Sequence, residues 1–281
     1  MEDRANPGYR GRIAPSPTGH LHLGHARTFW TAYQRSLSRG GTLILRNEDL
    51  DRDRVRSEFV EAFLEDLHWF GIRWQEGPDC GGAHAPYSQS ERSAGYRTAF
   101  EALRDAGRLF PCTCSRKDIQ AAVRAPHAAD DEPIYPGTCR DRSAAEVPAG
   151  RPVSWRFRVP DGEVLSWSDE GQGPQSWIAG RDFGDFVVLR PDGVPSYQLA
   201  CVVDDHAMGV TEVVRGADLL VSTARQILLY RALGWNPPDF FHCPLMTDEH
   251  GVRLAKRHDA LSLRALRDQG RGPAELRDSW K

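Results

Sequence analysis

The sequence lacks any apolar run that approaches the ~20 residues of a membrane-spanning helix. It also lacks the apolar segment of a signal peptide, because residues 1–10 are mostly polar and charged. We therefore expect a cytoplasmic protein with no membrane partner. Hydrophobic residues still make up 40% of the 281 residues, which is ordinary for a globular protein and sufficient for a sizeable core.

The chain also has little net charge, −3 at pH 7. Non-specific, charge-driven binding to nucleic acid is therefore not expected as its main function. The arginines could still gather into a local basic surface that meets a folded RNA. The alternative is a mixed, solvated surface.

Cysteine is scarce, with six residues in all, and three of the six fall between positions 112 and 139. In a cytoplasmic chain, such clustering indicates a metal site more than disulfides. The alternative is three reduced thiols without metal. We expect the scattered cysteines to be small buried apolar residues: Cys80, Cys201 and Cys243.

Strand and helix patterns alternate at the start of the chain. Residues 9–14 and 42–46 are typical of short buried strands, and a helical pattern follows each of them. The first helix is predicted from about residue 24 to 39, and the second ends at Gly71, a natural C-terminal cap. Strand, helix, strand, helix is typical of a βαβ unit. We therefore predict an α/β fold with a Rossmann-like, doubly wound parallel sheet.

From about residue 110 to 151 the periodicity ends, which indicates an insertion. Beyond it we predict the second half of the sheet, with Ser222 as the N-cap of the last helix. The predicted strands are residues 153–159, 186–189 and 212–215, and the predicted helices are residues 197–203 and 222–233.

The turn after the first strand carries the first chemical signal. In open α/β sheets, ligands bind at the carboxyl ends of strands, and a helix N-terminus favours phosphate. His22 and His25 could face the same phosphates, and Gly24 would let a flat base approach the backbone. The stretch matches neither the dinucleotide fingerprint nor the P-loop. A His-x-x-His pair also occurs on ordinary surfaces, but the whole string of residues 15–25 is far more specific.

At this string the chain resembles the glutamyl branch of class I aminoacyl-tRNA synthetases, whose signature His-Ile-Gly-His corresponds to His22-Leu-Gly-His25. The resemblance implies a ligase with ATP, L-glutamate and tRNA as partners and Mg²⁺ accompanying the ATP. Other blocks resemble that family in order along nearly the whole chain: residues 45–51, 76–79, 87–92, 202–206 and 229–235.

Glutamate carries two carboxylates and an ammonium, so its pocket needs guanidinium groups and at least one carboxylate. The resemblance places Arg12 and Arg215 on a substrate carboxylate and Glu48 on the ammonium. It gives hydroxyl contacts to Ser16 and Tyr197. Without the resemblance, each of these would be interpreted as a surface ion pair or a packed tyrosine.

The family's second nucleotide signature, Lys-Met-Ser-Lys-Ser, corresponds to residues 253–257, Arg-Leu-Ala-Lys-Arg. Ala255 lacks the serine hydroxyl, so a contact through that oxygen is lost. Lys256 matches the lysine that steadies the phosphates, and the resemblance makes it catalytic together with His22 and His25. The residues implied for ATP are Pro15, His22, Gly24, His25, Arg253 and Lys256.

The cysteine cluster resembles the zinc site of this branch, in the arrangement Cys112-x-Cys114 followed by Tyr135-x-x-x-Cys139. The resemblance implies a structural Zn²⁺ held by three thiolates and one phenolate. With this site, the predicted division of the chain is residues 1–109 and 152–240 for the two halves of the catalytic domain, 110–151 for the zinc-binding insertion, and 241–281 for the nucleotide loop and a short helical end.

Little sequence follows residue 257, which leaves no room for the family's helical anticodon-binding domains. A subgroup with this truncated plan joins glutamate to the queuosine base at the wobble position of tRNA(Asp). We predict this activity, in a monomer. The alternatives are glutamate charging at the tRNA 3′ end, an inactive tRNA-binding paralogue, and a small-molecule ligase that shares only the fold.

Overall fold

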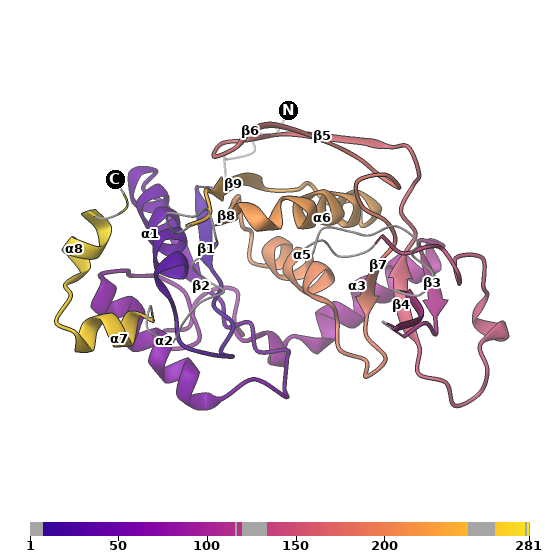
Figure 1. Ribbon diagram of the computed structural model, residues 1–281, viewed down its shortest axis with the longest axis horizontal. Helices are drawn as coiled ribbons and strands as arrows, with labels where there is room; N and C mark the ends of the chain where they lie inside the picture. Colours follow the sequence, from indigo (N-terminus) through magenta and orange to yellow (C-terminus); the bar gives the residue numbers. More distant parts are fainter. Residues whose placement is uncertain (1–7, 116, 120–133, 247–261, 279, 281) are drawn as a thin grey trace.

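The computed structural model describes residues 8–115, 117–119, 134–246, 262–278 and 280. Its first part is the expected βαβ unit, in which two strands pair in parallel and a helix follows each (Figure 1). Apolar side chains from these elements share one buried cluster, which explains why the periodic pattern was informative. The elements are β1 (Arg10–Ile13), α1 (Leu23–Ser38), β2 (Thr42–Leu45) and α2 (Ser57–Phe70).

A second parallel pair, β8 (Glu212–Gly216) and β9 (Asp239–Cys243), comes from the other half of the chain. It lies beside the first pair, because the Thr211 amide donates to the Arg10 carbonyl at 2.9 Å. Two helices lie next to this second pair in Figure 1: α5 (Tyr197–Ala207) and α6 (Leu220–Ala232). The α/β prediction is therefore confirmed.

The predicted doubly wound parallel sheet is found in part, because an antiparallel hairpin extends the β8–β9 pair. Strand β5 (Val164–Asp169) pairs in parallel with β9 but antiparallel with β6 (Gly173–Ile178). Along β5, buried and exposed residues alternate, which is typical of a strand with one solvated face. The sequence analysis predicted neither strand of this hairpin.

The strands expected at residues 153–159 and 186–189 exist but do not join the parallel layer. They are β4 (Ser154–Phe157) and β7 (Phe186–Leu189), and β4 pairs antiparallel with both β7 and β3 (Leu109–Cys112). The Phe157 and Phe186 rings stack, with centroids 5.3 Å apart. This sheet has its own place at one end of the molecule, next to α3 (Ser93–Asp105) (Figure 1).

Helix ends test the predicted caps. Gly71 caps α2 with a φ of 90°, a left-handed conformation that glycine adopts at little cost. The Ser222 prediction is wrong, because α6 begins at Leu220 and Ser222 is buried inside it, where its hydroxyl accepts a hydrogen bond from Gln198 Nε2 at 3.0 Å. Short 3₁₀ turns occupy Gln89–Glu91, Ala144–Glu146 and Ala217–Leu219.

The last helices of the chain return to its first ones. They are α7 (Leu263–Asp268) and α8 (Pro273–Asp278). The Leu263 amide donates to the Leu21 carbonyl at 2.7 Å, and Arg277 Nη1 donates to the Phe70 carbonyl at 2.9 Å. Among the described residues, no helix combines the length and apolar character needed to cross a membrane.

Candidate active site

A cavity of about 480 Å³ opens where β1, β2 and β8 end and α1 begins. This is the edge of an open sheet at which ligands bind. The Pro15 side chain is not part of the lining, but its carbonyl accepts the Glu48 amide at 3.0 Å. The cavity brings together all of the predicted glutamate-binding residues and several of the ATP-binding ones: Arg12, Ser16, Glu48, Tyr197, Arg215, His22, Gly24 and His25.

Arg12 lies at the floor of the cavity, almost completely buried. Its Nη1 donates to the Val214 carbonyl at 2.8 Å, and its Nε lies 3.5 Å from Asp205 Oδ1. Although burial alone would raise the pKa of Asp205, Arg46 and Arg12 lower it below its usual value, so this carboxylate is charged. A buried carboxylate behind Arg12 thus compensates its charge before any ligand is present.

Glu48 is held from two sides. Arg46, which is completely buried, donates to Glu48 Oε1 at 3.0 Å and to Asp205 Oδ1 at 2.5 Å. Burial raises the pKa of the Cys201 thiol, which stays protonated and lies 3.5 Å from Glu48 Oε1 as a donor. Both contacts use Oε1, so the other carboxylate oxygen is the one that can accept a ligand ammonium.

Arg215 also lines the cavity and is nearly buried. Its guanidinium donates to Tyr197 Oη at 3.2 Å, to Thr223 Oγ1 at 2.7 Å and to His242 Nε2 at 3.2 Å. Two arginines and the Glu48 carboxylate therefore line a single cavity, which Asp218 also lines. This is the donor and acceptor set that a free dicarboxylic amino acid requires.

His22 and His25 mark the start of α1. Their rings stack with centroids 3.6 Å apart, and His22 Nδ1 accepts the Gly24 amide at 3.1 Å as the helix N-cap. A Cβ at Gly24 would lie 3.1 Å from His22 Cε1, so glycine permits this ring position. Loss of water around the His25 ring lowers the pKa of His25, and the adjacent His22 lowers it further. The two rings therefore do not both carry a charge near pH 7.

The sequence analysis missed several residues that shape the cavity. Arg46 and Asp205 fall inside blocks that resemble the family, and their charge within apolar surroundings was the signal that could have marked them. His242, Thr223 and Asp169 had no comparable signal. His242 and Thr223 lie 27 and 8 positions from Arg215, and Asp169 lies 73 positions from His242, so the sequence gives no sign that these side chains meet. The other missed lining residues include Thr28, Phe29, Asp218, Pro244, Leu245 and Met246.

Arg253 and Lys256 lie outside the described residues, together with the rest of the basic loop at 253–257. The structure therefore gives no contact for either side chain. Their assignment to ATP stays a prediction. The cavity wall formed by residues 244–246 is the described part of the chain that leads toward this loop.

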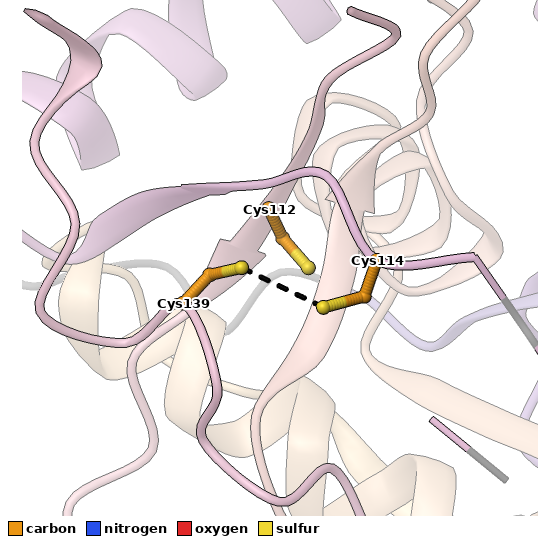
Figure 2. A group of neighbouring side chains, drawn as sticks. All are labelled: Cys112, Cys114 and Cys139. Atoms are coloured by element: carbon orange, nitrogen blue, oxygen red, sulfur yellow. Dashed lines mark hydrogen bonds between the residues drawn. The ribbon is translucent and has the colours of Figure 1, made fainter. Parts of the chain in front are cut away.

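Far from this cavity, the three clustered cysteines converge at the end of β3 (Figure 2). Their sulfurs lie within 4.8 Å of one another, with 3.6 Å between those of Cys114 and Cys139. Tyr135 Oη lies 3.4 Å from Cys112 Sγ and 3.6 Å from Cys114 Sγ. Of the scattered cysteines, Cys201 and Cys243 are buried as predicted, but Cys80 is exposed, so its prediction is wrong.

Comparison with known proteins agrees with this geometry. Residues 9–278 match the family described as tRNA synthetases class I (E and Q), catalytic domain. The chain is 52% identical over 269 residues to glutamyl-Q tRNA(Asp) synthetase of Symbiobacterium thermophilum, covering 94% of this chain and 82% of that protein. It is 45% identical to glutamate–tRNA ligase 2 of Acidithiobacillus ferrooxidans, covering 96% of this chain and 56% of the ligase.

A solved structure has the same fold. The glutamate tRNA ligase of Elizabethkingia meningosepticum, in complex with its amino acid, superposes with a TM-score of 0.77 at 32% identity. The match covers 89% of this chain and 52% of the ligase, so the chain spans about half the length of that protein. The chain therefore belongs to the class I tRNA synthetases of the glutamate and glutamine type, whose catalytic domain residues 9–278 form.

Proposed function

We propose that this chain activates L-glutamate with ATP and transfers the glutamyl group to the queuosine base at the wobble position of tRNA(Asp). The observation that carries the first half is the single cavity that Arg12, Glu48 and Arg215 line together. The second half rests on the similarity to a glutamyl-Q tRNA(Asp) synthetase over most of both chains.

Activation joins two substrates in one cavity. The glutamate α-carboxylate attacks the α-phosphorus of ATP, a new O–P bond forms, and pyrophosphate leaves. Arg12 and Arg215 bind substrate carboxylate, Glu48 binds the ammonium, and Ser16 and Tyr197 offer hydroxyls. Holding both reactants in line supplies much of the rate. Magnesium, when bound with ATP, neutralises phosphate charge.

The nucleotide lies at the start of α1. The free N–H groups of a helix N-terminus attract phosphate, and the neutral His25 ring can donate a hydrogen bond without a charge. Pro15, Gly24 and His22 complete this side of the ATP site, and Arg253 and Lys256 would reach it from the basic loop. Lys256 would balance charge that develops on the leaving pyrophosphate.

In the second step, a hydroxyl of the queuosine cyclopentenediol attacks the carbonyl carbon of the glutamyl adenylate. An ester bond forms, the acyl–phosphate bond breaks, and AMP leaves. The reaction requires no covalent bond to the enzyme. Glutamyl transfer to a tRNA 3′ end is the second candidate, because the similar Elizabethkingia structure is a glutamate tRNA ligase.

The cysteine cluster fits a structural zinc. Tetrahedral zinc with Zn–S bonds of about 2.3 Å places sulfurs about 3.8 Å apart. The 3.6 Å separation of Cys114 and Cys139 is close to this value, and Tyr135 Oη lies at similar distances from Cys112 and Cys114. These four residues would close the coordination sphere, so the metal would brace residues 110–151 rather than act on substrate.

The division of the chain and its acceptor also belong to this proposal. Residues 1–109 and 152–240 would form the catalytic body, and residues 241–281 the nucleotide loop and helical end. As a monomer, the chain would then meet the anticodon loop with the catalytic body itself.

The test separates the two acceptors. The protein is incubated with ATP, labelled glutamate and tRNA(Asp) from cells that make queuosine, or from cells that do not. Ribonuclease digestion then shows whether the label is on the anticodon loop or the 3′-terminal adenosine. We expect label on the anticodon loop of queuosine-containing tRNA(Asp) alone. Label at the 3′ end of tRNA(Glu) would favour the second candidate, and no glutamate-dependent pyrophosphate exchange would overturn the proposal.

A further inference from the structure

We propose that His242 and Asp169 are positioning residues that fix the guanidinium of Arg215 for the glutamate carboxylate. The inference rests on the proposed function, because it assumes that Arg215 binds glutamate. Neither residue lines the cavity, so each acts through Arg215.

The hydrogen bonds of Arg215 leave little freedom in its orientation. Its Nε donates to His242 Nε2 at 3.2 Å, and its Nη2 donates to Thr223 Oγ1 at 2.7 Å. Its Nη1 donates to Tyr197 Oη at 3.2 Å. A guanidinium has five N–H donors in a fixed planar fork. Two of them therefore remain, one on each terminal nitrogen, which is the pair that a carboxylate accepts in a bidentate contact.

The contact with Arg215 determines the tautomer of His242. A guanidinium can only donate, so His242 Nε2 must accept and cannot carry a proton. The ring proton then lies on Nδ1, which hydrogen-bonds Asp169 Oδ2. Thr223 Oγ1 also lies 3.0 Å from Nε2, while its single proton is directed to the Leu219 carbonyl at 3.2 Å, so Arg215 is the donor to Nε2. A neutral imidazole thus connects Asp169 to Arg215.

Asp169 is itself fixed by the turn of the β5–β6 hairpin. Its Oδ1 accepts the amides of Gly171, Gln172 and His242 at 2.9–3.0 Å. The side chains of Asp169 and His242 are completely buried. The hairpin, which the sequence analysis did not predict, therefore contributes to the site through a chain of contacts from Asp169 to His242 to Arg215.

The charges around His242 agree with this arrangement. Burial has the largest effect and the charge of Arg215 the next, and together they lower the pKa of His242 to about 4. Asp169 acts in the opposite direction and raises it. Arg12 acts in the same direction as Arg215. An imidazolium next to Arg215 would place two positive charges together and remove the acceptor for Nε. The neutral ring leaves the Arg215 charge available to the substrate.

Two variants separate positioning from packing. In His242→Gln, the side-chain amide oxygen can take the place of Nε2 as acceptor for Arg215. His242→Phe retains an aromatic ring and removes the acceptor. In glutamate-dependent pyrophosphate exchange, we expect H242F to raise the KM for glutamate about 10-fold or more and H242Q by about 3-fold or less. The KM for ATP should stay unchanged in both. In an Arg215→Ala background, H242F should cause no further rise.

A second readout does not depend on activity. Nitrogen NMR of protein with labelled histidine, with H242Q used to assign the signal, should show His242 protonated at Nδ1 and bare at Nε2 at pH 7. A proton on Nε2, or equal glutamate KM values in H242F and wild type, would overturn the inference. If wild-type protein shows no exchange with glutamate, the proposed function fails, and the NMR result still decides whether His242 accepts from Arg215.

Discussion

Arg46 Nη2 donates to Glu48 Oε1 at 3.0 Å, although the Arg46 side chain is completely buried and Glu48 faces the cavity. The same guanidinium contacts Asp205, which in turn lies behind Arg12. Glu48 and Arg12 therefore have a common buried support. Because charged groups inside a protein need paired partners, these two cavity-lining residues depend on residues that are not part of the cavity lining.

Removal of Arg46 tests this dependence through stability. In Arg46→Met, Asp205 loses its closest positive partner in a buried setting, so we expect the free energy of unfolding to fall by about 3–5 kcal/mol. Urea unfolding is the measurement. Arg54→Met is the matched control, because the exposed Arg54 pairs with nearby Asp51 and its loss should cost less than about 1 kcal/mol. Equal losses in the two variants would contradict the shared support.

Substitution of the arginines that face the cavity tests the glutamate site. Arg12→Ala and Arg215→Ala should each raise the KM for glutamate strongly and leave that for ATP nearly unchanged. A lost charged contact in a desolvated pocket costs about 2–5 kcal/mol. Pyrophosphate exchange at varied glutamate measures this effect. Arg190→Ala, which removes an exposed arginine paired with Asp192, is the control. Normal glutamate dependence in both test variants would show that the pocket is assigned wrongly.

The cysteine cluster leads to a prediction about metal content. Cys139→Ser should reduce bound zinc and slow transfer to tRNA more than adenylate formation, since the cluster lies outside the cavity that we propose for nucleotide and amino acid. Metal analysis of protein purified without chelator is the measurement. Cys80→Ser, at an exposed thiol, should leave zinc unchanged. Wild-type protein with almost no zinc and full transfer activity would refute the metal assignment.

Glu212 makes stability depend on pH. Burial alone would raise its pKa, but hydrogen bonds from Arg35 and Tyr9 and the charge of Arg39 lower it below 4.5. Because the pKa of Glu212 is lower in the folded than in the unfolded chain, the ionised carboxylate stabilises the fold above pH 4.5. This stabilisation is lost as the pH falls toward and through the pKa of the folded state.

We therefore expect Glu212→Gln to show a smaller loss of unfolding free energy than wild type as the pH falls from 7 to well below 4.5. Urea unfolding across that range gives the comparison. Glu275→Gln, at an exposed residue paired with Arg271, should follow the wild-type curve. An unchanged pH dependence in Glu212→Gln would mean that this carboxylate does not titrate differently in the folded state.

Local patterns in the sequence were enough to locate most elements. The apolar spacing after β2 predicted α2, and Gly71 ends that helix as expected, because periodicity and caps depend on neighbouring residues. The motif around His22 and His25 lies at the start of α1, within one continuous stretch. The resemblance to the family also identified Arg12, Glu48, Tyr197 and Arg215, which line one cavity.

Contacts between distant segments were decided only by the tertiary structure. Strands β4 and β7 were predicted as part of the parallel sheet, yet they lie in a separate antiparallel sheet in which β4 pairs with both β3 and β7. Ser222 resembles an N-cap but lies inside α6. Asp169 and His242 are 73 positions apart and carry no shared pattern. Strand pairing and buried hydrogen bonds depend on which surfaces meet after folding, so a local pattern of residues cannot specify them.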